Sequence, residues 1–446
     1  MTGTFLRNGL LGLAVALLLS CGGGGGGGVA GAGAGAAGTV GAPPAGGMGS
    51  LLEGSNAGGP GDGQGGSAAT GTSTASAGSN GDGSGVGSGG TGVSTADAAG
   101  IGAVDGAGSI FVNGLRYNTD AVVVSIEDTP ALQLGMSAKV AGPVDAEFTS
   151  GVARRIESAA DVRGTVSSVS PAQGSFVILG TTVTTDEATV WGDSTGLAAI
   201  APGATLQIWG LPAAPGVLLA TRVEQRGPSE PILSGTVQNL DATARTFTLG
   251  GILVDYSAAT SSTSPDGRPL ANGTLVRVRA NAELRGRLPA TLVQWWYPVP
   301  IMASSTPLQL AGVVTDYAGL SALRVLGVTV DTSSAQITGG PSSSIGNGVK
   351  VQVAGHLVSG VLKATKIKIR HVPGTGGSAS FNLAGNIGSF SSASSFKVRG
   401  QPIDAGGPGV VFVNGTAANL GNGVRVGVEG ARVVDGVLTA NRVTFN

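Results

Sequence analysis

The stretch LGNGVRVGVEG, residues 420–430, contains the pattern that decides the fold. A glycine turn is followed by a short run in which valines alternate with other residues. Successive side chains of an extended strand point to opposite faces, so Val424, Val426 and Val428 share one face. Arg425 points the other way. The pattern predicts a β-strand with one apolar face towards a core and the other towards solvent.

The same strand recurs earlier in the chain at intervals of about 70–75 residues, so the chain contains internal repeats. The earlier copies are LGMSAKVAG (134–142), IAPGATLQIWG (200–210), LANGTLVRVRA (270–280) and IGNGVKVQVAG (345–355). In the copy at 270–280, Val276 and Val278 are predicted to face the core. Arg277 and Arg279 are predicted to face solvent.

Two further predicted strands occur in the same order in each repeat. A second strand precedes the glycine turn, and a closing strand follows it. The second strands are FVILGTTV (176–183), FTLGGILV (247–254), LRVLGVTV (323–330) and FKVRGQPI (396–403). The closing strands are GVLLATRVE (216–224), RLPATLVQ (287–294), GVLKATKIK (360–368) and GVLTANRVT (436–444). Ala280 replaces the strand-ending glycine of the other copies, which predicts a longer or distorted hairpin there.

These patterns predict an all-β fold of tandem small antiparallel β-barrel units, OB-like or SH3-like, after a disordered Gly/Ser/Ala-rich tether. A short sheet leaves exposed edges unless it curls up, and closure into a barrel removes them. The predicted boundaries are a signal peptide at 1–20, a lipidated cysteine and tether at 21–101, and β units at 102–160, 161–227, 228–303, 304–376 and 377–446.

The pattern G-x-V…F-x-V-x-G-x-x-V-x-V-D…L-x-x-G-x-x-V-x-V-x-G…G-x-L-x-A-x-R-I, together with the opening GSIFVNGLRY (108–117), resembles domain-of-unknown-function family 5666. The resemblance covers about residues 102–446. It implies a bacterial lipoprotein or secreted protein with tandem repeats. It implies no catalytic residue, because the motifs consist of apolar residues and glycines.

The N-terminal region contains the stretch LLLSCGGGGGGG, residues 17–28. Arg7 precedes an apolar run at 10–19 that is too short to span a bilayer but suits the core of a signal peptide. The segment 18–21 resembles the bacterial lipobox, which implies cleavage before Cys21 and lipidation of its thiol. An ordinary secretory signal with an incidental thiol is the alternative. Gly22, where inner-membrane retention usually needs Asp, favours the outer membrane by the same resemblance.

The segment from Gly22 to about Gly100 consists mostly of Gly, Ala, Ser, Thr and Asp. Such a segment cannot bury enough apolar surface to offset the entropy lost on ordering. We therefore expect a flexible tether with a root-mean-square span of ~50 Å.

The composition argues against several function classes. The formal net charge is −1, aromatic residues make up 4%, and the chain has two histidines among 446 residues. The charge and the shortage of stacking aromatics disfavour nucleic-acid binding. GDSTG (192–196) has the form of a nucleophile elbow but lies in a predicted loop without a following helix. We expect no enzyme activity, no catalytic residues, no metal site and no cofactor.

Asp186, Asp255, Asp331 and Asp404 occupy one equivalent place in four repeats, just after the second strand's glycine and its apolar partner. Aspartate side chains accept backbone N–H groups at such bends, so a role in turns is predicted. Calcium binding is the alternative, but it requires several converging oxygen ligands.

Two stretches are candidates for ligand contact. In KATKIKIRH (363–371), Lys366, Lys368 and Arg370 share one strand face, which is either a solvated face or a contact for anionic lipid or polysaccharide. In VQWWYP (293–298), Trp295 and Trp296 point to opposite faces. They either pack at the joint between the third and fourth units or form a platform for sugar or a protein partner.

Together these features predict a non-enzymatic, lipid-anchored envelope protein of the outer membrane, facing the periplasm or the cell surface. Its units would act as a spacer or a binding array. The expected partners are the membrane, through Cys21, and an envelope glycan or protein; no nucleic-acid partner is expected. Carbohydrate or cell-wall binding is the alternative function, and an enzyme with a site in a groove between units is a more distant one.

Overall fold

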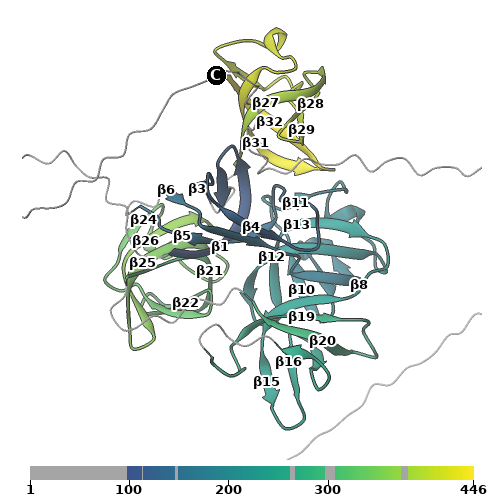
Figure 1. Cartoon of the computed structure of the whole chain (residues 1–446), viewed down its shortest axis with the longest axis vertical. Coiled ribbons are helices and arrows are strands. Elements are labelled where there is room, and N and C mark those ends of the chain that lie inside the picture. Colours follow the sequence, from purple (N-terminus) through teal and green to yellow (C-terminus); the bar gives the residue numbers. More distant parts are fainter. Residues whose placement is uncertain (1–97, 113, 146–148, 262–266, 297–306, 373–379) are drawn as a thin grey trace, which may run out of the picture. The chain divides into compact units, whose positions relative to one another are not determined.

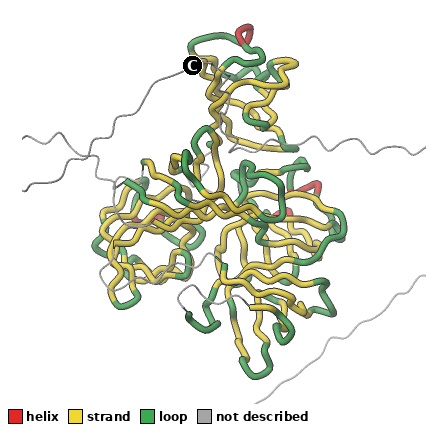
Figure 2. Tube along the Cα trace, in the orientation of Figure 1, coloured by secondary structure: helices red, strands yellow, loops and turns green. Residues whose placement is uncertain are grey.

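The computed structural model describes residues 98–446 except 113, 146–148, 262–266, 297–306 and 373–379. Strands dominate the described chain, and its helices are short 3₁₀ turns (Figure 2). In this described part no helix has the length and apolarity needed to cross a membrane. The content agrees with the predicted all-β class, whereas the predicted architecture differs from the observed one.

The strands fall into five successive repeats (Figure 1). Repeat 1 contains β1 (Ala98–Ala107), β2 (Ile110–Val112), β3 (Leu115–Asn118), β4 (Val123–Ile126), β5 (Ser137–Gly142), β6 (Ser150–Val152) and β7 (Arg155–Ser158). Repeat 2 contains β8 (Val162–Ser170), η1 (Pro171–Gln173), β9 (Ser175–Ile178), β10 (Thr181–Thr184), β11 (Val190–Trp191), η2 (Leu197–Ala199), β12 (Thr205–Ala214) and β13 (Val217–Arg226). Repeat 3 contains β14 (Ile232–Thr236), β15 (Gln238–Asp241), β16 (Thr246–Leu249), β17 (Ile252–Asp255), β18 (Thr260–Ser261), β19 (Leu275–Ala280) and β20 (Arg287–Trp295). Repeat 4 contains β21 (Pro307–Gly319), β22 (Ala322–Val325), β23 (Val328–Asp331), β24 (Gln336–Thr338), η3 (Ser342–Ser344), β25 (Lys350–Val358) and β26 (Val361–His371). Repeat 5 contains β27 (Phe381–Ser392), β28 (Ser395–Val398), β29 (Gln401–Asp404), β30 (Val411–Val413), η4 (Ala417–Asn419), β31 (Arg425–Val434) and β32 (Val437–Phe445).

Each repeat ends in a hairpin, and its last strand also pairs in parallel with an earlier short strand. In repeat 5, β32 pairs antiparallel with β31 and parallel with β29 and β30. The corresponding parallel pairs elsewhere are β10–β13, β17–β20 and β23–β26. The prediction of purely antiparallel units is therefore wrong. A long connection carries the chain from the short strands to the hairpin and returns the last strand in the same direction.

The prediction of closed, separate barrel units is also wrong. The described strands form two extended sheets, of 19 and 13 strands, that run through several repeats. β14 of repeat 3 pairs with β8 of repeat 2, and β1 pairs in parallel with β21 of repeat 4 and β27 of repeat 5. The repeats thus stack as the coils of a β-solenoid do. Exposed edges are removed by pairing with the next coil rather than by closure of each unit.

The strand-ending glycine of the long hairpin lies at a β-bulge. The register shifts at Gly210, Gly355 and Gly430. A side chain at Gly355 would collide with the carbonyl oxygen of Lys363, so the strands approach too closely for another residue. At Ala280 the register also shifts, and residues 281–286 connect the two strands, whereas only residues 359–360 do so in repeat 4. The predicted longer hairpin is confirmed.

The apolar faces of the strands form three main cores, as their alternation predicts. One core is shared by repeats 2 and 3, and another belongs to repeat 4. The third combines side chains of repeats 1 and 5, for example Val104 and Leu438, both fully buried, with Val190 and Trp209 of repeat 2. Two repeats that are far apart in sequence therefore depend on each other for their packing.

In the long hairpins of repeats 2 and 3, residues on the opposite face are buried as well. Arg277, predicted to face solvent, is 0% exposed, and Gln207 and Trp209 of repeat 2 are 1% and 0% exposed. The prediction for Arg277 is wrong because a neighbouring repeat, and not water, covers the outer face of β19. Arg279 remains partly exposed.

The four repeated aspartates have the predicted structural role. Each accepts a hydrogen bond from the backbone N–H two residues further on, at distances of 2.9–3.0 Å. The donors are Ala188, Ser257, Ser333 and Gly406. These are Asx turns, which direct the chain out of the second strand.

Candidate functional site

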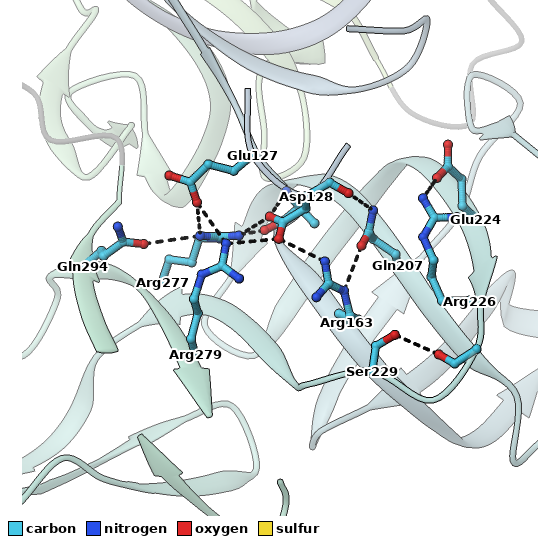
Figure 3. Close-up of polar contacts among 12 residues, drawn as sticks. Glu127, Asp128, Arg163, Gln207, Glu224, Arg226, Ser229, Arg277, Arg279 and Gln294 are labelled. Carbon is cyan, nitrogen blue, oxygen red and sulfur yellow. Dashed lines mark hydrogen bonds and ion pairs between the residues drawn. The ribbon is translucent and has the colours of Figure 1, made fainter. Parts of the chain in front are cut away.

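A cluster of charges lies where repeats 1, 2 and 3 meet (Figure 3). Its centre is Asp128, two residues after the end of β4, and the side chains of Arg163, Arg277 and Arg279 point towards it. Arg163 Nη2 lies 2.9 Å from Asp128 Oδ1, Arg279 Nη2 lies 3.0 Å from the same oxygen, and Arg277 bonds Asp128 Oδ2. Burial raises the pKa of Asp128, but the three arginine charges outweigh it and hold the pKa below its usual value.

Arg277 is the member of this cluster with the most contacts. Its Nε donates to the carbonyl oxygen of Ala160 at 2.8 Å, and its Nη1 lies 3.1 Å from Glu127 Oε2. The guanidinium also lies 4.9 Å from the ring centroid of Trp296, a cation–π contact. One side chain of repeat 3 therefore binds two segments of repeat 1 and the end of its own repeat.

A second buried carboxylate, Asp161, lies close by. It is 0% exposed and accepts hydrogen bonds from Ser137 Oγ at 2.6 Å, the Gly210 N–H at 2.9 Å and Trp296 Nε1 at 2.7 Å. Burial raises its pKa. The donors come from repeats 1, 2 and 3, so Asp161 also joins three repeats.

The structure places the two predicted tryptophans differently. Trp296 donates its indole N–H to Asp161 and packs against Arg277, so it belongs to the joint between repeats. Both tryptophans line a cavity of about 350 Å³ between repeats 3 and 4, but Trp295 is not held by Asp161, and Arg268 lies 5.4 Å from its ring centroid. Of the two, Trp295 has the position that suits ligand contact.

A second cavity, of about 430 Å³, adjoins the one at Trp295 and shares six lining residues with it, among them Leu275, Leu326 and Arg324. Its lining is mostly apolar, with polar groups such as Asn239 and Asn272. Small-molecule sites have this character, an apolar wall with a few polar groups that fix orientation. We refer to the two cavities together as the inter-repeat groove.

The basic strand lies in β26. Ile367 and Ile369 are buried in the core, as the alternation predicts. Lys366, Lys368 and Arg370 are half-buried, and each has interaction partners. Arg370 Nε donates to Gln352 Oε1 at 2.6 Å. Its side chain also lines a cavity with Asp105, whose pKa burial raises to about 6.

The sequence interpretation did not single out Asp128 or Asp161. A signal was present at Asp128, because Glu127 and Asp128 form an acidic pair in a chain with only 11% charged residues. Cys21 lies outside the described residues. Within the described ranges, no three His, Cys, Asp or Glu side chains are grouped so that they could hold a metal ion.

These observations define a class, a tandem β-repeat protein whose repeats are joined by buried ion pairs and enclose a groove between them. A family model described as domain of unknown function (DUF5666) matches residues 163–224, 234–294, 311–368 and 384–444. The four matches coincide with repeats 2–5. The chain belongs to the DUF5666 family, as the sequence patterns indicated. No curated protein matches it.

Proposed function

We propose that the protein is a non-enzymatic, lipid-anchored component of the bacterial outer membrane whose repeats form a stiff spacer or binding array. The observation that carries the proposal is that the buried charged residues join the repeats to one another. Asp128, Asp161 and Arg277 each bond groups from other repeats rather than point into a cavity. Buried, paired charges fix how the repeats join, as suits an extended scaffold. The lipobox-like segment supplies the anchor.

Replacing Cys21 with Ser is expected to move the protein from the membrane fraction to the soluble fraction, because the serine cannot accept the lipid. Fractionation of the envelope followed by immunoblotting measures the change. Ser20→Ala, which keeps the cysteine and a small residue before it, serves as the matched control and is expected to remain membrane-bound. Recovery of Cys21→Ser in the outer membrane would show that the anchor is wrong.

A carbohydrate or cell-wall binding function is the second candidate, and the position of Trp295 favours it. The half-buried indole lines the inter-repeat groove beside Arg268. An aromatic ring offers an apolar surface against which the face of a sugar ring packs, and the arginine and asparagine side chains offer hydrogen bonds to its hydroxyls.

Trp295→Ala is expected to weaken glycan binding at least tenfold, because an aromatic anchor in a pocket typically contributes about 2 kcal/mol. A glycan array with the soluble full-length Cys21→Ser protein identifies the ligand, and titration then compares the variants. Tyr317→Ala provides an aromatic control on repeat 4 that does not line the groove. An array without signal above background leaves the spacer as the function.

A further inference from the structure

A separate cavity of about 360 Å³ is formed by residues of repeats 1, 4 and 5, together with Ala188 of repeat 2. Asp105 of β1, Lys350 at the start of β25, and Arg370 and His371 at the end of β26 line it. Its volume suits a ligand of monosaccharide size. It has no lining residue in common with the inter-repeat groove.

Lys350 is the unusual group in this cavity. It is 8% exposed, and its ammonium makes no hydrogen bond or ion pair with any residue in the described part of the chain. The nearest opposite charges, Asp105 and Asp186, interact with it electrostatically without forming an ion pair within 4.0 Å. An ammonium without an ion-pair partner at the wall of a cavity can form a charge-assisted hydrogen bond with an anion that enters it.

Two other polar atoms at the cavity lack a hydrogen bond among the described residues. Asp105 Oδ2 accepts the Gly114 N–H at 2.8 Å, whereas its buried Oδ1 has no hydrogen-bond partner among the described residues. His371 Nε2 is likewise buried without a hydrogen bond among the described residues, and its ion-pair partner Asp186 Oδ2 lies 3.6 Å away. A bound molecule would therefore meet a cation at Lys350 and a free acceptor at Asp105.

We propose that this cavity binds a small polyhydroxylated anion, in which a carboxylate or phosphate group meets Lys350 and Arg370 and a hydroxyl group donates to Asp105. Ser380 and Asn382 add neutral hydrogen-bonding groups. Phe111 and Phe381 supply apolar walls for the face of a sugar ring. Acidic monosaccharides and sugar phosphates share this chemistry. The proposal depends neither on the lipid anchor nor on Trp295.

Isothermal titration calorimetry of the soluble full-length Cys21→Ser protein tests the proposal with three probes, D-glucuronate, D-glucose 1-phosphate and neutral D-glucose. At least one anion is expected to bind at one site per chain, and glucose is expected to bind at least tenfold more weakly. Saturation by glucuronate identifies a carboxylate ligand, and saturation by the phosphate alone identifies a phosphate ligand. The proposal is overturned if neither anion binds more tightly than glucose.

Lys350→Met tests the contact itself, because methionine keeps the length and removes the charge. It is expected to weaken anion binding at least tenfold. Lys363→Met, an exposed lysine of the same repeat that pairs with Asp331, is the matched control and is expected to bind as the parent does. If Lys350→Met does not fold, Ala188→Leu fills the cavity from another wall and is expected to abolish binding. Unchanged binding in whichever of these two variants folds refutes the site.

Discussion

Arg277→Met is expected to lower the free energy of unfolding by about 3–5 kcal/mol, the usual cost of removing one partner of a buried ion pair. The methionine keeps the apolar stem but leaves the buried Asp128 with two arginines instead of three and the Ala160 carbonyl without its donor. It also removes the cation from the face of Trp296. Repeats 1 and 3 lose one of their direct connections, and only Arg279 then joins Glu127 and Asp128 to β19.

Urea denaturation followed by circular dichroism measures the loss for Arg277→Met. Arg287→Met is the matched control, since Arg287 is half-exposed and lies 3.7 Å from Asp255. An exposed pair of this kind contributes about 0–1 kcal/mol. A double-mutant cycle with Asp128→Asn is expected to give a coupling energy above about 1 kcal/mol. Equal losses in the two methionine variants would show that the cluster does not hold the repeats together.

The alternation of apolar residues was sufficient to predict the strands and their core faces. Val276, Val278 and Ile367 are all 0% exposed, on the faces predicted for them. The turns could be predicted equally well, because the aspartate after each second strand accepts a hydrogen bond from the backbone N–H two residues further on. Such features depend on neighbours along the chain, which is why a single sequence contains the information.

The arrangement of the repeats could not be predicted from the sequence in the same way. The sequence pattern around an outward-facing residue is the same whether water or another repeat covers that residue. Arg425 of repeat 5 and Lys350 of repeat 4 occupy the same position of the hairpin, yet Arg425 is exposed and Lys350 is 8% exposed. The difference arises because repeats 1 and 5 cover the start of β25. Trp209, an outward-facing aromatic residue, was the available signal that an outer face is buried.

In the candidate sites, too, the sequence could indicate some residues but not the residues that they meet in the fold. Trp295 and Arg370 could be selected from composition, because aromatic and clustered basic residues are rare in this chain, and both line cavities. Their partners could not be selected. Asp105 and Lys350 are far apart in sequence and come together only because β1 pairs with β21 and β27. That pairing is a long-range property of the fold.

Deletion of residues 436–446 is expected to unfold repeat 5 and, with it, the β2–β3 hairpin of repeat 1. The deletion removes β32, which pairs with β29, β30 and β31. Leu438 and Val443, both 0% exposed, would leave the core that they share with Ile110 and Leu115. Repeats 2 and 3, with their own core, and repeat 4, with another, are expected to stay folded.

Hydrogen exchange with peptide-level resolution measures the extent of this unfolding. Protection is expected to fall in 381–434 and in 110–118, and to persist around Phe176, Phe247 and Val351, which lie in the other two cores. Leu438→Ala, which removes buried side-chain volume, is expected to cost about 2–5 kcal/mol and to weaken the same two segments. Val411→Ala is the control, since Val411 is 51% exposed. Loss confined to repeat 5 would mean that the repeats fold as separate units, and loss throughout would mean that all five form one cooperative structure. Loss in repeats 1 and 5 alone is the result that a shared core requires.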